Sequence, residues 1–161
     1  MTGASLTAVG LVALFLAQAC LMLVDEWLFH RRRGLEPWER WGHPLDSIVY
    51  AAALLVPALA PPRAPWGPLY AALAVASCLL ITKDEWVHAR SCAAGEHWVH
   101  AVLFLIHPAV LIFSGFLWAS GEGASLRLSL PVAVAAFAAY QIVAGGGRGA
   151  RARDGVGASH A

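Results

Sequence analysis

The sequence Asp-Glu-Trp-Leu-Phe-His at residues 25–30 is followed by Glu-Arg-Trp-Gly-His at residues 39–43, and this pair of motifs occurs twice. The second copy reads Asp-Glu-Trp-Val-His at residues 84–88 and Glu-His-Trp-Val-His at residues 96–100. In each copy the first motif ends an apolar segment and the second motif begins the next one. The duplication therefore predicts two similar helical hairpins, each with acidic residues and histidines at one end.

The composition is typical of a membrane protein. Of the 161 residues, 59% are hydrophobic and 13% are charged, whereas soluble domains average about 45–50% apolar and about 25% charged residues. The formal net charge of +1 gives no reason to expect nucleic acid as a partner. Cys20, Cys78 and Cys92 form no paired-cysteine motif. We therefore expect no disulfide framework, and a site that faces a reducing compartment.

Five apolar segments are long enough, at about 17 residues or more, to span a bilayer as helices. The first continues through Ala19 and Cys20 instead of stopping at a cleavage site, so we interpret it as a span and not as a signal peptide. Helix-breaking residues separate the segments, among them Gly34 and the proline-rich stretch 61–65. The predicted spans are residues 5–29, 37–60, 68–90, 96–119 and 128–144.

These spans predict an all-α integral membrane fold with five transmembrane helices in a single membrane domain, residues 1–144. Two parallel helical-hairpin repeats, residues 5–62 and 66–120, are expected to form a four-helix bundle as the core. The helix at residues 128–144 is then an extra, fifth helix. Glycine and arginine dominate residues 145–161, and we expect a disordered cytoplasmic tail there.

The basic residues predict how the chain is oriented in the membrane. If the N-terminus is outside, Arg63 and Arg127 lie on the outer side and every other lysine and arginine lies on the inner side. The positive-inside rule then places both copies of the motif on the cytoplasmic side. We expect a multi-pass protein of a bacterial-type inner (plasma) membrane with a cytoplasmic C-terminus. The repeats should be related by a rotation about the membrane normal.

Acidic residues and histidines share one face of each of the first four predicted helices. At about 100° per residue, one stripe of the second helix holds Glu39, His43, Asp46 and Tyr50. The predicted catalytic residue is Tyr50, as a hydrogen-bond or electron donor near a metal site on that stripe.

The matching stripe of the fourth helix holds Glu96, His100 and His107. Glu39 and Glu96 are the expected bridging ligands, because they occupy equivalent positions in the two copies. On the third helix either Asp84 or Glu85 pairs with His88. The complete set of predicted metal ligands is Glu26, His30, Glu39, His43, Asp46, Asp84, Glu85, His88, Glu96, His100 and His107.

Energetics favour a metal site as the reason for this pattern. An ionisable side chain at mid-membrane costs about 2.5–3.5 kcal/mol on insertion scales, and bound cations would neutralise several carboxylates at once. Helix bundles with two metal ions use inward-pointing glutamates and histidines in a similar way. We expect two divalent metal ions as cofactors. Without thiolate ligands, iron is favoured, and zinc or manganese also suits the ligand set.

The preferred functional hypothesis is a non-haem di-iron oxidoreductase of the hydroxylase, desaturase or oxygenase type. The substrate is expected to be a lipid or another lipophilic small molecule, reached from the cytoplasmic side, and an electron donor is an expected partner. The histidine boxes of membrane hydroxylases and desaturases, HxxxH and HxxHH, do not occur in this chain. The hypothesis therefore rests on the ligand pattern alone.

Other functions use the same residue types. Two zinc ions in the same site would suit a hydrolase or isomerase, because zinc generates hydroxide near neutral pH. A metal or proton transporter would use the residues as a relay, and a haem-binding protein would use facing histidines. The fourth alternative is a salt-bridged rim, in which Arg40, Lys83 and Arg90 neutralise the acids.

Overall fold

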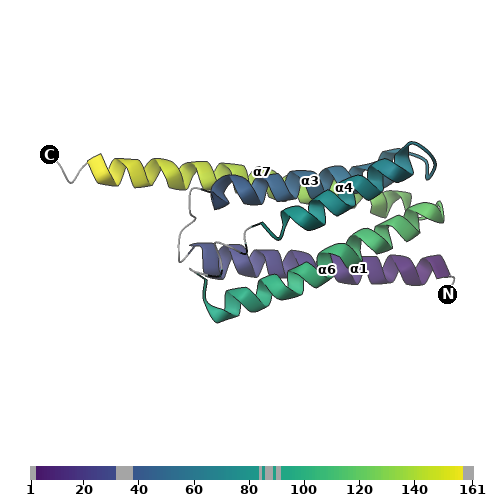
Figure 1. The fold of residues 1–161 in the computed structure, drawn as a ribbon, viewed down its shortest axis with the longest axis horizontal. Helices are drawn as coiled ribbons and strands as arrows, with labels where there is room; N and C mark the ends of the chain where they lie inside the picture. The colour runs from purple at the N-terminus through teal and green to yellow at the C-terminus, as the bar shows by residue number, and fades with distance from the viewer. Residues whose placement is uncertain (1–2, 32–37, 84, 86–88, 90–91, 158–161) are drawn as a thin grey trace.

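The computed structural model describes residues 3–31, 38–83, 85, 89 and 92–157, with side chains described as far as residue 145. Within these ranges the chain forms helices joined by short turns and contains no strand (Figure 1). The all-α class predicted from the sequence is confirmed.

The helices follow the order predicted from the apolar segments. Helix α1, Gly3–Val24, continues directly into a π-helix, η1, Asp25–His30. In the part of the chain that the structure describes, four helical segments are long and apolar enough to cross a membrane: Gly3–His30, Glu39–Leu59, Ala94–Ala119 and Ala124–Gly145. The five-helix count agrees with the prediction. The remaining helices have the bounds α3, Glu39–Leu59; α4, Trp66–Leu80; α6, Ala94–Ala119; and α7, Ala124–Gly157.

Helix α4 is shorter than predicted, because it ends at Leu80 and not near Arg90. The Thr82 hydroxyl donates a hydrogen bond to the Leu79 carbonyl at 2.7 Å, and such side-chain bonds compete with the helical pattern. Lys83 then forms an ion pair with Asp46 of α3. A polar turn at residues 81–83, tied to α3 by this ion pair, therefore follows α4 directly.

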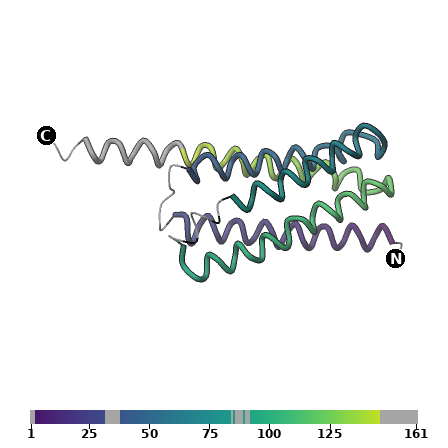
Figure 2. The backbone as a smooth tube through the Cα atoms, in the orientation of Figure 1, coloured from purple at the N-terminus to yellow at the C-terminus, as the bar shows by residue number. Residues whose placement is uncertain are grey.

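The helices pack in two connected groups. Helix α3 packs against α7 and α4, while α1 packs against α6, and contacts of α6 with α3 and α4 join the groups. Figure 2 shows the same arrangement, with α3 and α7 running alongside each other. Leu130 and Val134 of α7 belong to the main hydrophobic core. The fifth helix is therefore an integral part of the core, whereas the sequence predicts an addition to a four-helix core.

A spacing of four residues explains why α7 packs so closely. Leu130, Val134 and Ala138 are all buried and lie one helical turn apart. At the end of this face the Gly145 backbone approaches the Arg40 carbonyl of α3. The helical backbone of α7 extends to Gly157, and the disorder of residues 145–161 stays a prediction.

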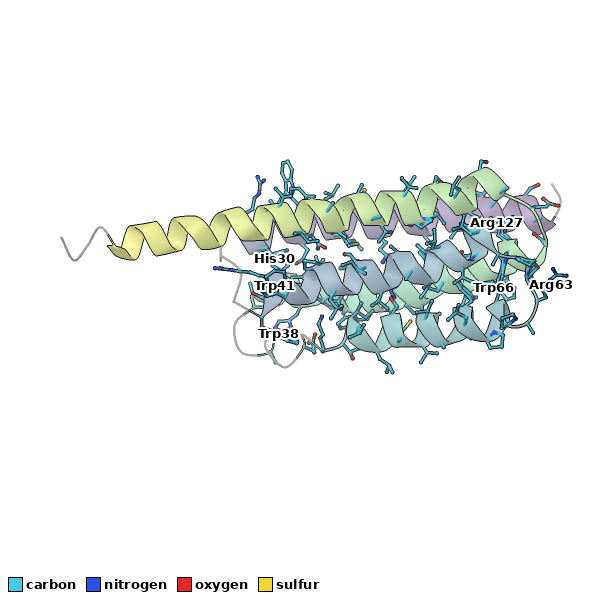
Figure 3. All side chains as sticks on the ribbon, turned by 90° about the horizontal axis from the view of Figure 1, so that it is seen from above. His30, Trp38, Trp41, Arg63, Trp66 and Arg127 are labelled. Atoms are coloured by element: carbon cyan, nitrogen blue, oxygen red, sulfur yellow. The ribbon has the colours of Figure 1, made fainter. Side chains whose placement is uncertain are left out.

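Tryptophan side chains lie at both ends of the bundle. Figure 3 shows His30, Trp38 and Trp41 at one end, and Arg63 and Trp66 at the other. Tryptophans gather at both water interfaces of membrane proteins. Large apolar side chains are also exposed along the helices between these ends, where a bilayer would cover them. The apolar helices and this surface indicate a multi-pass membrane protein.

Candidate metal centre

The π-helix η1 places three polar side chains in the interior. Asp25, Glu26 and His30 are buried, while Trp27 and Leu28 of the same helix are exposed. In an α-helix, positions 25 and 30 would lie about 140° apart around the axis. A π-helix instead bonds residues five apart, which brings Asp25 and His30 to the same side. Both acids consequently lie beside one imidazole.

His30 is the centre of the arrangement. Its Nε2 atom lies 3.5 Å from Oδ2 of Asp25, and its Nδ1 atom lies 3.5 Å from Oε2 of Glu26. From α6, Oε1 of Glu96 lies 3.7 Å from the same Nε2 atom. Also from α6, the Nε2 atom of His100 lies 3.2 Å from Oδ1 of Asp25. Two helical segments thus contribute two carboxylates and two imidazoles to one cluster, with Glu26 beside it.

Helix α3 closes the cluster from a third direction. Glu39 is fully buried in the first turn of α3, and the ring centroid of His43 lies 4.7 Å from that of His30. Glu96 occupies the first turn of α6 in the same way. The positive end of a helix dipole stabilises a carboxylate at this position. Both helices therefore present an acid and, one turn later, a histidine.

These side chains form two overlapping groups with the spacing of metal ligands. The first group consists of Asp25, His30, Glu96 and His100, and the second of His30, Glu39 and His43. Within each group the potential ligand atoms lie within 4.8 Å of one another. Ligands at about 2.0–2.2 Å from one ion are separated by about 3–4 Å. Small side-chain rotations would therefore allow each group to hold one ion.

The ring nitrogen at the centre of the cluster is buried between two carboxylates. Among the described residues, His30 Nε2 has no hydrogen-bond partner, although the residue is only 2% exposed. A buried polar atom without a partner costs about 1–3 kcal/mol. The nitrogen lies between the carboxylates of Asp25 and Glu96. A cation bound there would satisfy the nitrogen and both acids.

Three predicted ligands are described in other interactions. Asp46 forms the ion pair with Lys83. Glu85 lies 3.6 Å from His97, and both side chains are partly exposed. His107 lies about two turns further along α6 than His100. Its Nδ1 atom is 3.0 Å from Gln18 Nε2, and its Nε2 atom is 2.9 Å from Ser77 Oγ. Neither Glu26, which lies beside His30, nor any of these three residues belongs to either ligand group. Asp84 and His88 lie outside the described residues.

Tyr50 belongs to the same deeper network and not to the metal cluster. Its hydroxyl donates to Oε1 of Gln18 at 3.0 Å, and its ring centroid lies 4.2 Å from that of His107. Since the Gln18 carbonyl accepts from Tyr50, the Gln18 amide donates to His107 Nδ1. His107 then carries its proton on Nε2 and donates to Ser77. This chain satisfies both ring nitrogens of His107.

Several residues near the cluster are not predicted by the sequence pattern. Asp25 belongs to the first motif, but α-helical spacing favours Glu26, and no signal in the sequence indicates a π-helix. Gln18 stands alone in an apolar run. Tyr140 of α7 donates to Oε1 of Glu26 at 3.4 Å, and Gln141 accepts from Ser47 at 2.8 Å. The sequence pattern does not predict that α7 contributes to the site.

The cluster borders a cavity of about 110 Å³. Asp25, His30 and His100 line one part of its wall, and Leu103, Phe104 and other apolar residues line another. Buried carboxylates and imidazoles without thiolates suit iron, manganese or zinc better than soft metals. The cavity leaves space beside the potential ligands for a small group to approach.

No family model, no curated protein and no solved structure matches this chain. Its function is therefore inferred from the geometry of the cluster.

Proposed function

We propose that this chain is a membrane-embedded metalloenzyme that binds two metal ions, with iron preferred, and oxidises a lipophilic substrate. The observation that carries the proposal is the pair of ligand groups that share His30. One ion would be held by the group with Asp25, Glu96 and His100, and the other by the group with Glu39 and His43.

Charge balance supports the binding of two ions. Asp25, Glu26, Glu39 and Glu96 are four carboxylates, each at most 8% exposed, and burial of several like charges is strongly unfavourable. Two divalent cations would neutralise four negative charges. Glu39 and Glu96 begin α3 and α6 and reach the cluster from different helices. They are the proposed bridging ligands.

The side chains around the cluster would position the substrate and keep bulk water away from the metal ions. Bound iron would supply the oxygen activation that is usual for carboxylate and histidine centres in helix bundles. Burial excludes bulk water from the cluster, while the adjoining cavity admits a substrate group. Glu26 lies 3.5 Å from Nδ1 of His30 and would orient that ring, as carboxylates do for metal-bound histidines. Tyr50 lines the same cavity and is the proposed hydrogen-bond or electron donor.

The distribution of charge supports a cytoplasmic position for the cluster. Arg63 and Arg127 lie at the end of the bundle opposite His30 (Figure 3). Arg31 directly follows the π-helix, and Arg40 lies in the first turn of α3, both beside the cluster. By the positive-inside rule, the end with the cluster faces the cytoplasm of a plasma membrane and the N-terminus lies outside.

The interior beyond the polar network favours a site over a transport path. Ser77, His107 and Gln18 extend the polar region from the cluster toward the middle of the bundle. Further along, the core is mainly apolar, with Leu11, Leu54 and Leu117 each at most 1% exposed, and Ser114 is a buried polar residue among them. A relay for ions or protons needs polar groups or water across the full thickness.

Metal analysis of the purified protein, together with its absorption spectrum, tests the proposal. Protein from iron-replete cells should contain two iron ions per chain and show an oxo-bridged di-iron band without a Soret band. Two zinc ions and a silent spectrum would favour the hydrolase or isomerase. A Soret band would indicate haem, and protein without metal would favour the salt-bridged rim.

A further inference from the structure

A second cavity, of about 180 Å³, lies beside the first. Helix α1 contributes Phe15, Ala19 and Leu23 to its wall, and α7 contributes Ala133 and Val134. Gln18 and Tyr50 are its polar lining residues. The rest of its lining is hydrocarbon, so the cavity has the chemistry of a site for an apolar group.

The two cavities share part of their walls. Gln18, Met22, Tyr50 and Phe137 line both of them. Met22 is flexible and adapts to irregular shapes, so a chain could pass between the cavities at this point. Along α1, Gln18 and Asp25 are seven residues apart, which corresponds to about 10 Å of helix. A molecule that occupies the apolar cavity is therefore within about 10 Å of the ligand groups.

The cavity opens toward the lipid-facing side of the bundle. Helix α7 packs on α3 and α1 packs on α6, so the wall between α1 and α7 is formed by side chains at their margins. Two of these are exposed: Leu23, at 48%, and Ala133. In a bilayer the medium at this surface is hydrocarbon. Molecules that enter here come from the membrane.

The polar groups that line the cavity already have hydrogen-bond partners within the protein. Tyr50 donates to Gln18, Gln18 donates to His107, and His107 donates to Ser77. These recorded bonds satisfy the Tyr50 hydroxyl proton, the Gln18 carbonyl and both ring nitrogens of His107. An apolar occupant would therefore leave none of these groups without a partner, and would bury its own surface favourably.

We propose that this cavity binds the hydrocarbon chain of the substrate, which enters sideways from the bilayer between α1 and α7. The chain extends past Met22 and Tyr50 so that another part of the same molecule reaches the metal cluster. This inference rests on the proposed function, because it assigns the substrate class to that site. It names a long-chain lipophile, and not a small water-soluble molecule, as the substrate.

Photolabelling in vesicles tests the proposal. The full chain is reconstituted in phosphatidylcholine vesicles with a fatty acid that carries a diazirine in mid-chain, and labelled residues are mapped by mass spectrometry. We expect labels concentrated at residues 15–23 and 133–137. Labels spread evenly over the exposed apolar residues of all helices would overturn the proposal, because that pattern is expected of bulk lipid.

A cavity-filling variant sharpens the test. Ala133→Trp should reduce labelling of residues 15–23 by about tenfold or more, the effect of losing about 1.4 kcal/mol of binding free energy. Ala139→Trp is the matched control, because Ala139 is an exposed residue of the same helix outside the cavity lining. Equal labelling in the two variants would contradict the proposal. If Ala133→Trp does not fold, Ala19→Phe fills the same cavity from α1 and gives the same comparison.

Metal content separates this inference from the proposed function. Both α7 variants should keep the metal content of the wild type, because neither residue lies in a ligand group. Concentrated labelling in a protein that contains no metal would support the chain-binding cavity and overturn the metalloenzyme. Loss of concentrated labelling in a protein with two metal ions would overturn the cavity proposal alone.

Discussion

The Nε2 atom of His30 lies 3.5 Å from Oδ2 of Asp25, although the two residues are five positions apart in one helix. The π-helical turn between them makes this contact, and it leaves Glu26 on the other side of the same ring. π-helical turns cost stability and occur frequently at functional sites. The contact thus gives His30 a central position that no other histidine of the two ligand groups has.

The shared position of His30 predicts an unequal effect of histidine substitutions. His30→Ala should reduce the metal content most, because its Nε2 atom binds one ion and its loss leaves both ligand groups incomplete. His43→Ala and His100→Ala each alter one group and should remove about one ion and weaken the second. Elemental analysis of the purified variants measures the stoichiometry. His97→Ala is the control, because His97 is partly exposed and pairs with Glu85. Equal metal loss in all four variants would contradict the assignment.

The two copies of the motif differ in their surroundings, and this difference predicts a second comparison. Glu26 is 4% exposed and lies beside His30, whereas the side chain of Glu85, at the equivalent position of the second copy, is 44% exposed. Glu26→Gln should therefore weaken metal binding by about tenfold or more, within the range for residues that orient metal ligands. Glu85→Gln should leave it nearly unchanged. Titration of metal-free protein with Fe²⁺ gives both affinities, and a larger effect of Glu85→Gln would contradict the structure.

The sequence alone predicts the helical class and the order of the helices because apolar length and helix breakers are local signals. It also indicates Glu39, His43, Glu96 and His100, since these residues follow regular α-helical spacing near a helix start. Two of these, Glu39 and Glu96, become fully or almost fully buried. The rotation about the membrane normal that should relate the two repeats stays a prediction.

The parts of the site that the sequence does not predict depend on non-local contacts or on irregular helical geometry. Asp25 comes close to His30 because the backbone between them is a π-helix. The prediction from sequence uses α-helical spacing, which places these two residues on different sides. Asp46 fits the stripe of α3, but its carboxylate forms an ion pair with Lys83, which lies in the turn after α4. The contribution of Tyr140 depends on how α7 packs against the rest of the bundle. Periodicity within one helix contains none of this information.

Close packing of α1 on α6 predicts a stability difference between two glycines. A Cβ atom at Gly10 would lie 2.6 Å from the Phe113 ring, whereas one at Gly67 would have no atom within 4 Å. Gly10→Leu should destabilise the fold by about 1–3 kcal/mol, the usual cost of overpacking. Thermal unfolding in detergent measures the effect, with Gly67→Leu as the control. If Gly10→Leu unfolds no earlier than the control, α1 and α6 do not pack as described.

The orientation predicted from charge is testable with accessible single cysteines. In a variant whose three native cysteines are replaced by serine, a cysteine at Arg63 should react with a membrane-impermeant maleimide in intact cells. A cysteine at Arg31, beside the cluster, should react only after the membrane is opened. This difference follows from the positive-inside rule and from the position of Arg63 at the end opposite His30. The reverse pattern would place the cluster outside.

The ion pair between Lys83 and Asp46 predicts that one partner alone is worse than neither. Both side chains are largely buried, at 16% and 13% exposure, and removal of one partner leaves a charge in a poorly solvated place. Lys83→Met should therefore destabilise the fold by about 3–5 kcal/mol. The double variant with Asp46→Leu should recover most of that loss, because neither charge remains. Urea or thermal unfolding of both variants measures the difference, and metal analysis of the double variant provides the control. Asp46 lies outside the two ligand groups, so the double variant should keep both metal ions. If it loses metal while its fold is intact, Asp46 is a ligand, as α-helical spacing predicts.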